Sequence, residues 1–276
     1  MTKRAACAGL LLAGLMNLAA GPVWAASVQL DELTWTEVRD GLRAGTTTVI
    51  LPVGGTEQNG PHMALGKHNF RAAFLSARIA DKLGNTLVAP VLTYVPEGRI
   101  SPPAGHMRFP GTISVPEDAF AAVLAGAARS LRQHGFLDIV LVGDSGNYQG
   151  QLKDVANRLN REWAGTLARA HYIAEYYQAA SVEFGRALRA RGLNEKQIGT
   201  HAAVADTSLM MAVDASRVRG EKLRAADSAS PDLGLGGDPS QSSAALGQIG
   251  VDLITEKTVA AIRQALSGRK QAAKKE

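Results

Sequence analysis

The strongest constraint on the fold of this chain is the alternation of short, apolar, β-branched segments with longer segments of helical spacing. Segments of strand type occur at residues 46–53, 86–95, 137–142 and 167–174. Segments of helical type occur at residues 34–42, 69–83, 116–134, 148–163, 179–191, 207–213 and 251–266. Strands that are apolar throughout and separated by helices indicate a parallel sheet covered on both faces. We therefore expect a three-layer α/β sandwich with a mostly parallel central sheet.

The first 25 residues have the pattern of a secretory signal peptide. Lys3 and Arg4 precede a short apolar stretch, which ends at a run of small residues around Ala25. The apolar stretch is short for a membrane span, which needs about 20 residues. The pattern predicts export to the periplasm, and an uncleaved N-terminal anchor is the alternative.

The remaining chain has the composition of one large domain. Hydrophobic residues make up 46% of the sequence, so a substantial core is available. We expect residues 26–268 to form this domain, with a loop at 226–243, and residues 269–276 to form a charged, disordered tail. No second long apolar run follows, so no stable membrane insertion is expected after signal cleavage.

Charge and cysteine content exclude several classes of function. The net charge is +5, but the basic residues form no stripe with interleaved aromatic residues, so no nucleic-acid partner is expected. Cys7 is the one cysteine, which excludes a disulfide framework and multi-cysteine metal sites.

Residues suited to catalysis or metal binding follow the predicted strands. Four of the six histidines lie in these loops, namely His62, His68, His106 and His201. Glu57 lies in the first loop, and a Gly-Asp-Ser-Gly-Asn segment follows the third strand. Because ligands bind at the carboxyl ends of the strands in such sheets, we expect these loops to form one site.

These segments together resemble the creatininase (creatinine amidohydrolase) family. The resemblance extends in order through most of the domain. Its motifs are matched by Pro52–His68, His106–Ser114, Val142–Asn147, His201–Ser208 and Gly237–Gly247. It implies the fold of that family, hydrolysis of a small cyclic or linear amide, and assembly into a homo-oligomer.

The resemblance also implies a metal centre with substituted ligands. Family members typically hold two divalent ions, and one ligand aligns with Glu57. A histidine ligand aligns with Asn59, a bridging aspartate with His68, and a second histidine with Asp144. A neutral imidazole offers one lone pair and cannot bridge two ions as a carboxylate does.

The substituted residues still include one imidazole and two carboxylates. Glu57, His68 and Asp144, with Asn59 as a weak oxygen ligand, suit a single zinc, manganese or iron ion. Two ions held by rearranged ligands, or no metal at all, remain alternatives. In the metal-free alternative Lys67 occupies the position of the missing cation.

The resemblance implies a mechanism in which metal-activated water attacks an amide carbonyl. His201 would donate a proton to the leaving nitrogen, and Asp206 would orient His201 or bind the metal. The side chains that we expect to bind the substrate are those of His62, His106, Ser145 and Asn147.

Two other functions remain open at this point. The first is a binding protein that keeps the fold but has lost catalysis, because several expected ligands are substituted. The second is a serine hydrolase with Ser145 as nucleophile, because Gly143–Gly146 follows a strand. The sequence has no histidine after His201, which disfavours the second alternative.

Overall fold

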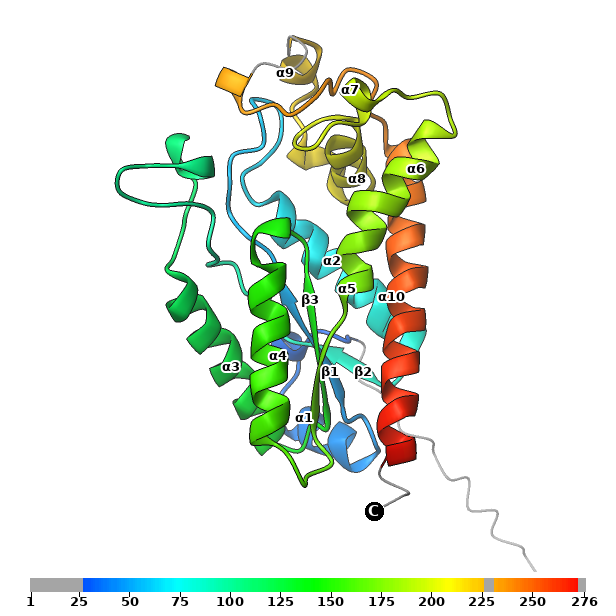
Figure 1. Ribbon diagram of the computed structural model, residues 1–276. Helices are drawn as coiled ribbons and strands as arrows, with labels where there is room; N and C mark the ends of the chain where they lie inside the picture. The colour runs from blue at the N-terminus through cyan, green and yellow to red at the C-terminus, as the bar shows by residue number, and fades with distance from the viewer. Residues whose placement is uncertain (1–26, 226–230, 273–276) are drawn as a thin grey trace, which may run out of the picture.

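The computed structural model describes residues 27–225 and 231–272 and contains one all-parallel sheet (Figure 1). The strand order is β2-β1-β3-β4. The strands are β1 (Thr48–Val53), β2 (Thr86–Val88), β3 (Asp138–Gly143) and β4 (Arg169–Tyr172). The carboxyl ends of β1 and β3 lie level, because Val53 pairs with Gly143. This confirms the predicted fold class.

Helices cover both faces of the sheet and its upper end in Figure 1. Those of the first two thirds of the chain are α1 (Trp35–Arg43), α2 (Lys67–Leu83), α3 (Glu117–Gln133), α4 (Gln149–Glu162) and α5 (Ala174–Gln178). A π-helical segment, Ala179–Glu183, joins α5 to α6 (Phe184–Arg189). The others are α7 (Glu195–Ile198), α8 (Val204–Asp214), α9 (Gly220–Ala225) and α10 (Ala244–Ala272).

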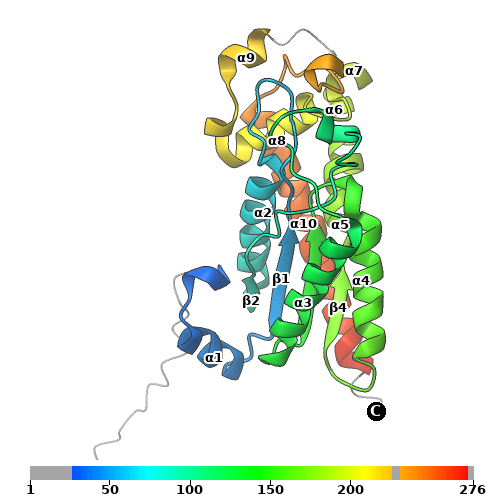
Figure 2. The ribbon, with the colours of Figure 1, turned by 90° about the vertical axis from the view of Figure 1, so that its left-hand side faces the viewer.

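The core has two halves, one on each face of the sheet. Val49 and Leu51 of β1 pack with residues of α1, α3 and α4. Ile50 of the same strand packs on the opposite side with residues of α2, α5, α6, α8 and α10. Figure 2 looks onto one face of the sheet, with α3 in front of it and α10 behind it. Because successive side chains point to opposite faces, a strand that is apolar throughout is buried on both.

Several element boundaries differ from those expected. β2 ends at Val88, well before residue 95, because Pro90 lacks the N–H that a ladder needs. Several helices begin earlier than expected, among them α2 at Lys67 and α8 at Val204. These two shifts matter for the site, because they place Lys67 and Asp206 in the first turns of helices.

The C-terminal helix is longer than the sequence pattern indicates. α10 extends to Ala272, and so continues past the expected domain boundary at residue 268 into the segment expected to be a disordered tail. Residues 273–276, the predicted signal peptide at 1–25, and residues 226–230 of the expected loop lie outside the described residues. None of the described helices combines the length and apolarity needed to cross a membrane.

Candidate functional site

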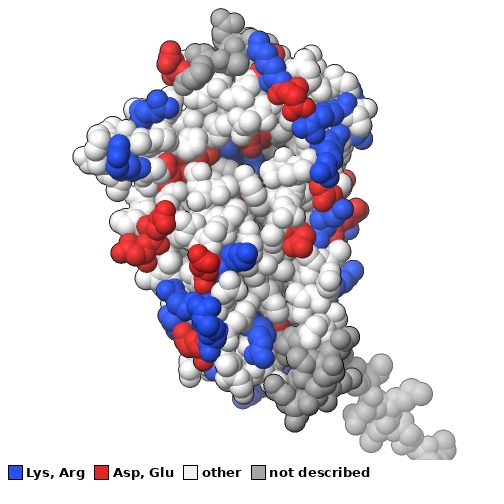
Figure 3. All heavy atoms as spheres, viewed as in Figure 1, with Lys and Arg blue, Asp and Glu red and all other residues white. Residues whose placement is uncertain are grey.

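A cavity of about 410 Å³ opens at the carboxyl ends of β1 and β3. These two strands flank the point where the strand order reverses, which is the usual ligand crevice of an open parallel sheet. In Figure 3 acidic and basic side chains are visible in a hollow in the upper part of the molecule. The ionisable side chains that line the cavity include Glu57, Lys67, His68, Arg71, His106, Asp144, His201 and Asp206.

Helix α2 brings three basic side chains to this cavity. Lys67, His68 and Arg71 lie in its first turns and are only 1%, 5% and 3% exposed. A helix N-terminus carries a partial positive charge, which disfavours cations. Burial adds a desolvation penalty for each charge. These residues are therefore stable there only if carboxylates surround them.

Lys67 and His68 contact the carboxylates of Glu57 and Asp144. Lys67 Nζ lies 3.4 Å from Glu57 Oε1, and His68 Nε2 lies 2.8 Å from the same oxygen. The other nitrogen of the imidazole, His68 Nδ1, lies 2.6 Å from Asp144 Oδ2. A carboxylate oxygen only accepts, so both nitrogens of His68 carry protons.

Arg71 and Asp206 connect Asp144 back to Lys67. Arg71 Nε lies 3.0 Å from Asp144 Oδ2, and Arg71 Nη1 lies 2.7 Å from Asp206 Oδ1. Asp206 Oδ2 in turn lies 3.0 Å from Lys67 Nζ. The contacts thus close into a ring of alternating charge, called the charge ring below. Its members are Lys67, Glu57, His68, Asp144, Arg71 and Asp206.

The charge ring is neutral because it holds three cations and three anions. Burial opposes ionisation of Glu57, but the charges of His68 and Lys67 hold its pKa well below the usual range. Burial also opposes the charge of His68, but Glu57 and the hydrogen bond to Asp144 raise its pKa. Burial is likewise outweighed at Asp206, whose pKa Lys67 and Arg71 hold well below the usual range.

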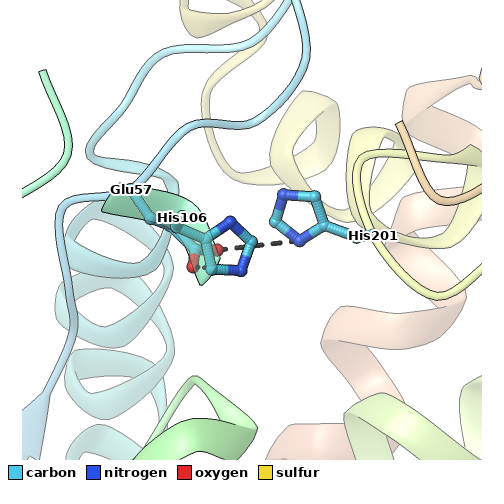
Figure 4. Close-up of side chains that lie close together, drawn as sticks. All are labelled: Glu57, His106 and His201. Atoms are coloured by element: carbon cyan, nitrogen blue, oxygen red, sulfur yellow. Dashed lines mark ion pairs between the residues drawn. The ribbon is translucent and has the colours of Figure 1, made fainter. Parts of the chain in front are cut away.

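A second cluster shares Glu57 with the charge ring. His106 Nε2 lies 3.2 Å from Glu57 Oε2, and His201 Nδ1 lies 3.7 Å from Glu57 Oε1 (Figure 4). One ligand atom from each of the three side chains lies within 4.8 Å of the others, a spacing that a metal ion can bridge. We call Glu57, His106 and His201 the Glu-His-His cluster.

Gln58 sets the orientation of both histidines. Its backbone carbonyl accepts a hydrogen bond from His201 Nε2 at 2.9 Å. Its side-chain Nε2 donates to His106 Nδ1 at 3.0 Å, while its Oε1 accepts the N–H of Gly60. In the neutral imidazoles, His201 therefore has its lone pair on Nδ1, and His106 has its lone pair on Nδ1 and its proton on Nε2.

The Glu-His-His cluster fits a single metal ion, with one adjustment. Burial, together with the nearby Lys67 charge, lowers the pKa of His201 to about 4, so this imidazole is neutral at pH 7. Its Nδ1 lone pair then faces the Glu57 carboxylate, and two facing electron-pair donors are stabilised by a cation between them. His106 is ready to bind only after its proton moves from Nε2 to Nδ1, which requires the Gln58 amide to turn over.

The predicted ligands other than Glu57 have different surroundings. Both nitrogens of His68 are used in the charge ring, and Asp144 also accepts a hydrogen bond from the Tyr176 hydroxyl. Asn59 is fully buried, and its Nδ2 donates to the backbone carbonyls of Glu57 and Ala64. The structure thus brings Glu57, His68 and Asp144 together, but through hydrogen bonds among themselves.

The predicted catalytic residues, His201 and Asp206, hydrogen-bond to different partners and not to each other. Asp206 accepts hydrogen bonds from Lys67, Arg71 and the backbone N–H of Ala202. His201 instead hydrogen-bonds to the Gln58 carbonyl. Ala202 has φ +52°, a left-handed conformation in which its N–H reaches the Asp206 carboxylate. Asp206 therefore contacts the backbone of the loop that carries His201.

The predicted substrate-binding residues lie in two environments. His106, Ser145 and Asn147 line the cavity. His62 is fully buried, and its Nε2 hydrogen-bonds to Thr207 Oγ1 at 2.9 Å. Ser145 Oγ accepts the N–H of Asn147, and no histidine of the described chain hydrogen-bonds to it.

Glu97 also belongs to the site, although no sequence motif singles it out. The side chain is buried and accepts a hydrogen bond from Asn147 Nδ2 at 2.7 Å. Burial and the nearby Glu57 charge raise its pKa to about 8, so it holds a proton at neutral pH. Gly55 makes room for it, because a Cβ there would lie 2.5 Å from Glu97 Oε1. The available signal was its position two residues after the predicted second strand.

The chain matches a known protein family over most of its length. The family model described as "Creatininase: Creatinine amidohydrolase" matches residues 31–262. This chain belongs to the creatininase family. The family resemblance seen in the sequence is thereby confirmed.

Curated relatives match part of the chain. Creatinine amidohydrolase of Pseudomonas putida is 32% identical over 126 residues, which is 46% of this chain and 47% of that protein. Mycofactocin precursor peptide peptidase of Mycolicibacterium smegmatis is 30% identical over 113 residues, 39% of this chain and 43% of that protein. For 3-dehydro-scyllo-inosose hydrolase of Thermotoga maritima the identity is 27% over 119 residues, 43% and 36% of the two lengths. The matches thus span less than half of each relative.

Solved creatininase structures share the fold over nearly their whole length. A mutant creatininase superposes with a TM-score of 0.74 and 24% identity, covering 87% of this chain and 98% of that one. Another mutant, described as of the Zn–Zn type, has a TM-score of 0.71 and 23% identity, with coverages of 87% and 99%. A third is described as "Creatininase Mn", with a TM-score of 0.71, 23% identity and coverages of 87% and 98%.

Loss of Arg71 is expected to destabilise the fold strongly. In Arg71→Met the buried carboxylates of Asp144 and Asp206 each lose a cationic partner. Removing one partner of a buried ion pair typically costs about 3–5 kcal/mol. Urea unfolding measures this as a drop in the free energy of unfolding. Arg129→Met, which breaks an exposed ion pair with Glu162, is the control and is expected to change stability far less.

His62 is expected to make the fold sensitive to acid. Burial lowers its pKa from 6.5 to about 4, so the unfolded chain takes up this proton before the folded chain does. The stability from His62 is therefore full above pH 6.5 and falls as the pH drops toward 4. In His62→Gln the unfolding free energy should fall less over this window. Parallel curves for parent and variant would refute this role, and exposed His134→Gln serves as the control.

Proposed function

We propose that this chain is a metal-dependent amidohydrolase that hydrolyses a small cyclic or linear amide in the cavity above β1 and β3. A single divalent ion, zinc, manganese or iron, would be held by the Glu-His-His cluster. The observation that carries the proposal is the lone pair of His201 Nδ1, which the hydrogen bond to the Gln58 carbonyl directs toward the Glu57 carboxylate.

A divalent ion in this position supplies Lewis acidity, which polarises an amide carbonyl and lowers the pKa of water. The chain itself supplies the orientation of the site. His68 and Lys67 hold one face of the Glu57 carboxylate, so its position relative to the two histidines is fixed. Ligands that are fixed from outside in this way lose little freedom on binding.

Proton transfer to the leaving nitrogen also needs a residue. Glu97 keeps a proton beside Glu57, because burial and the Glu57 charge raise its pKa to about 8, and a carboxylic acid can act as a general acid. Its other partner, Asn147, lines the cavity. We therefore assign proton storage to Glu97, whereas His201, with its Nδ1 turned toward Glu57, acts as a ligand.

The cavity restricts the size and chemistry of the substrate more closely than family membership does. The names of three relatives specify creatinine, a precursor peptide and 3-dehydro-scyllo-inosose, so members act on different compounds. The cavity of about 410 Å³ has room for a small molecule. Polar groups of Ser145, Asn147 and Tyr177 border it and suit hydrogen bonds to an amide.

Location and assembly are part of the same proposal. The apolar stretch of residues 5–20 after Lys3 and Arg4 supports export to the periplasm. Family membership supports assembly into a homo-oligomer, since soluble oligomers are mostly symmetric copies of one chain.

One observation favours a second candidate, a binding protein without catalysis. The carboxylates of Glu57, Asp144 and Asp206 already have cationic partners in the charge ring. A site neutralised by its own side chains holds together without an ion and can still accept a small polar molecule. Metal content distinguishes the two candidates.

Metal content and amide hydrolysis test the proposal together. Protein purified without a metal-affinity tag should contain about one equivalent of a transition metal and hydrolyse at least one member of a panel of small amides. Chelation should abolish this activity, and Glu57→Gln should lose both metal and activity. Exposed Glu117→Gln is the control. Metal content near zero that does not rise on reconstitution would favour the binding protein, and metal-independent activity lost in Ser145→Ala would favour the serine hydrolase.

Gln58→Glu is expected to tighten metal binding. A glutamate can accept hydrogen bonds both from the N–H of Gly60 and from a protonated Nδ1 of His106, and His106 then has its lone pair on Nε2 beside Glu57. Carboxylates behind a ligating histidine typically change metal affinity by about 10- to 100-fold. Zinc titration by calorimetry should show a gain at the lower end of that range. Unchanged or weaker binding in Gln58→Glu would mean that His106 is not a ligand.

A further inference from the structure

Besides Glu57, the carboxylates that line the cavity are Asp144 and Asp206, and both belong to the charge ring, so a second metal ion would have to bind there. We propose that Lys67 and Arg71 take the place of a second metal ion and exclude it, so that the site holds no more than one divalent ion. The first ion rests on the function proposed above, but the exclusion of a second ion rests on the charge ring alone.

Lys67 occupies the gap between two carboxylates. Its Nζ lies 3.4 Å from Glu57 Oε1 and 3.0 Å from Asp206 Oδ2, and its side chain is only 1% exposed. A divalent ion shared by these two oxygens would need the space that the ammonium group fills. An ammonium and a metal ion compete for the same oxygens because both bind carboxylates through charge.

Arg71 has the same relation to the next pair of carboxylates. Its guanidinium contacts Asp144 Oδ2 at 3.0 Å and Asp206 Oδ1 at 2.7 Å, and the residue is only 3% exposed. The planar guanidinium keeps its charge at any working pH. Asp144 and Asp206 therefore both contact a cation that cannot lose its proton.

The contacts of the three carboxylates leave a position for one ion but not for two. Within the charge ring three cations face three carboxylates, so each carboxylate of the ring already has a cationic partner. Glu57 Oε2 faces His106 and not a member of the charge ring. By contrast, a creatininase of the same fold is described as of the Zn–Zn type. The basic residues of α2 thus distinguish this chain from a two-metal centre.

Metal stoichiometry in Lys67→Met tests the exclusion. The variant removes the positive charge but keeps an unbranched side chain, so Glu57 Oε1 and Asp206 Oδ2 lose the ammonium group that lies between them. Zinc titration by calorimetry, followed by elemental analysis of the dialysed protein, should show one equivalent more in the variant than in the parent protein. The exposed control Lys153→Met should keep the parent stoichiometry. Lys67→Arg should keep it too, because arginine retains the positive charge.

Each outcome separates this inference from the proposed function. A parent with one equivalent and a variant with two supports both. A parent with none and a variant with one overturns the metal site at the Glu-His-His cluster but supports the exclusion by Lys67. Two equivalents in the parent, or equal numbers in parent and Lys67→Met, overturn the exclusion.

A second variant guards against loss of the fold. Lys67→Gln removes the charge but keeps a hydrogen-bond donor toward Asp206, so the buried carboxylate retains a partner. Circular dichroism verifies that each variant is folded before it is titrated. If Lys67→Met does not fold, the same rise of one equivalent is required of Lys67→Gln, and its absence there overturns the inference.

Discussion

Three positive side chains buried at the start of one helix are the constraint on which the site depends. Lys67, His68 and Arg71 are held at the N-terminus of α2, where both the helix dipole and desolvation oppose them. Carboxylates from three other segments offset that cost: the loop after β1, the end of β3 and the first turn of α8. The charge ring therefore also connects these segments to α2 around the floor of the cavity.

The same contacts divide the Glu57 carboxylate between two tasks. Oε1 belongs to the charge ring through His68 and Lys67 and also lies 3.7 Å from His201, whereas Oε2 faces His106. A carboxylate held by so many partners is a well-positioned ligand. Glu97 completes the arrangement, since a carboxylic acid that keeps its proton can lie beside the Glu57 charge without repelling it.

Family membership and site chemistry diverge in this chain. The fold agrees with solved creatininases over nearly their whole length, while the identity is only 23–24% for the structures compared. A fold can keep its strand ends and loops in place while the charges that line them change. Here side-chain cations stand among the carboxylates of the cavity, so the family name alone does not define how the site balances its charge.

The sequence by itself determined the parallel sheet, the loops that form the site and the family, because apolar periodicity and local motifs are properties of neighbouring residues. It also brought Glu57, His68 and Asp144 to one place, since strand ends in a parallel sheet meet at one edge. Only the tertiary structure decided what those residues contact. Lys67 and Asp206 are 139 positions apart, and the atoms that face His201 depend on a hydrogen bond to Gln58. Such contacts follow from how loops close in space, and spacing along the chain carries no record of them.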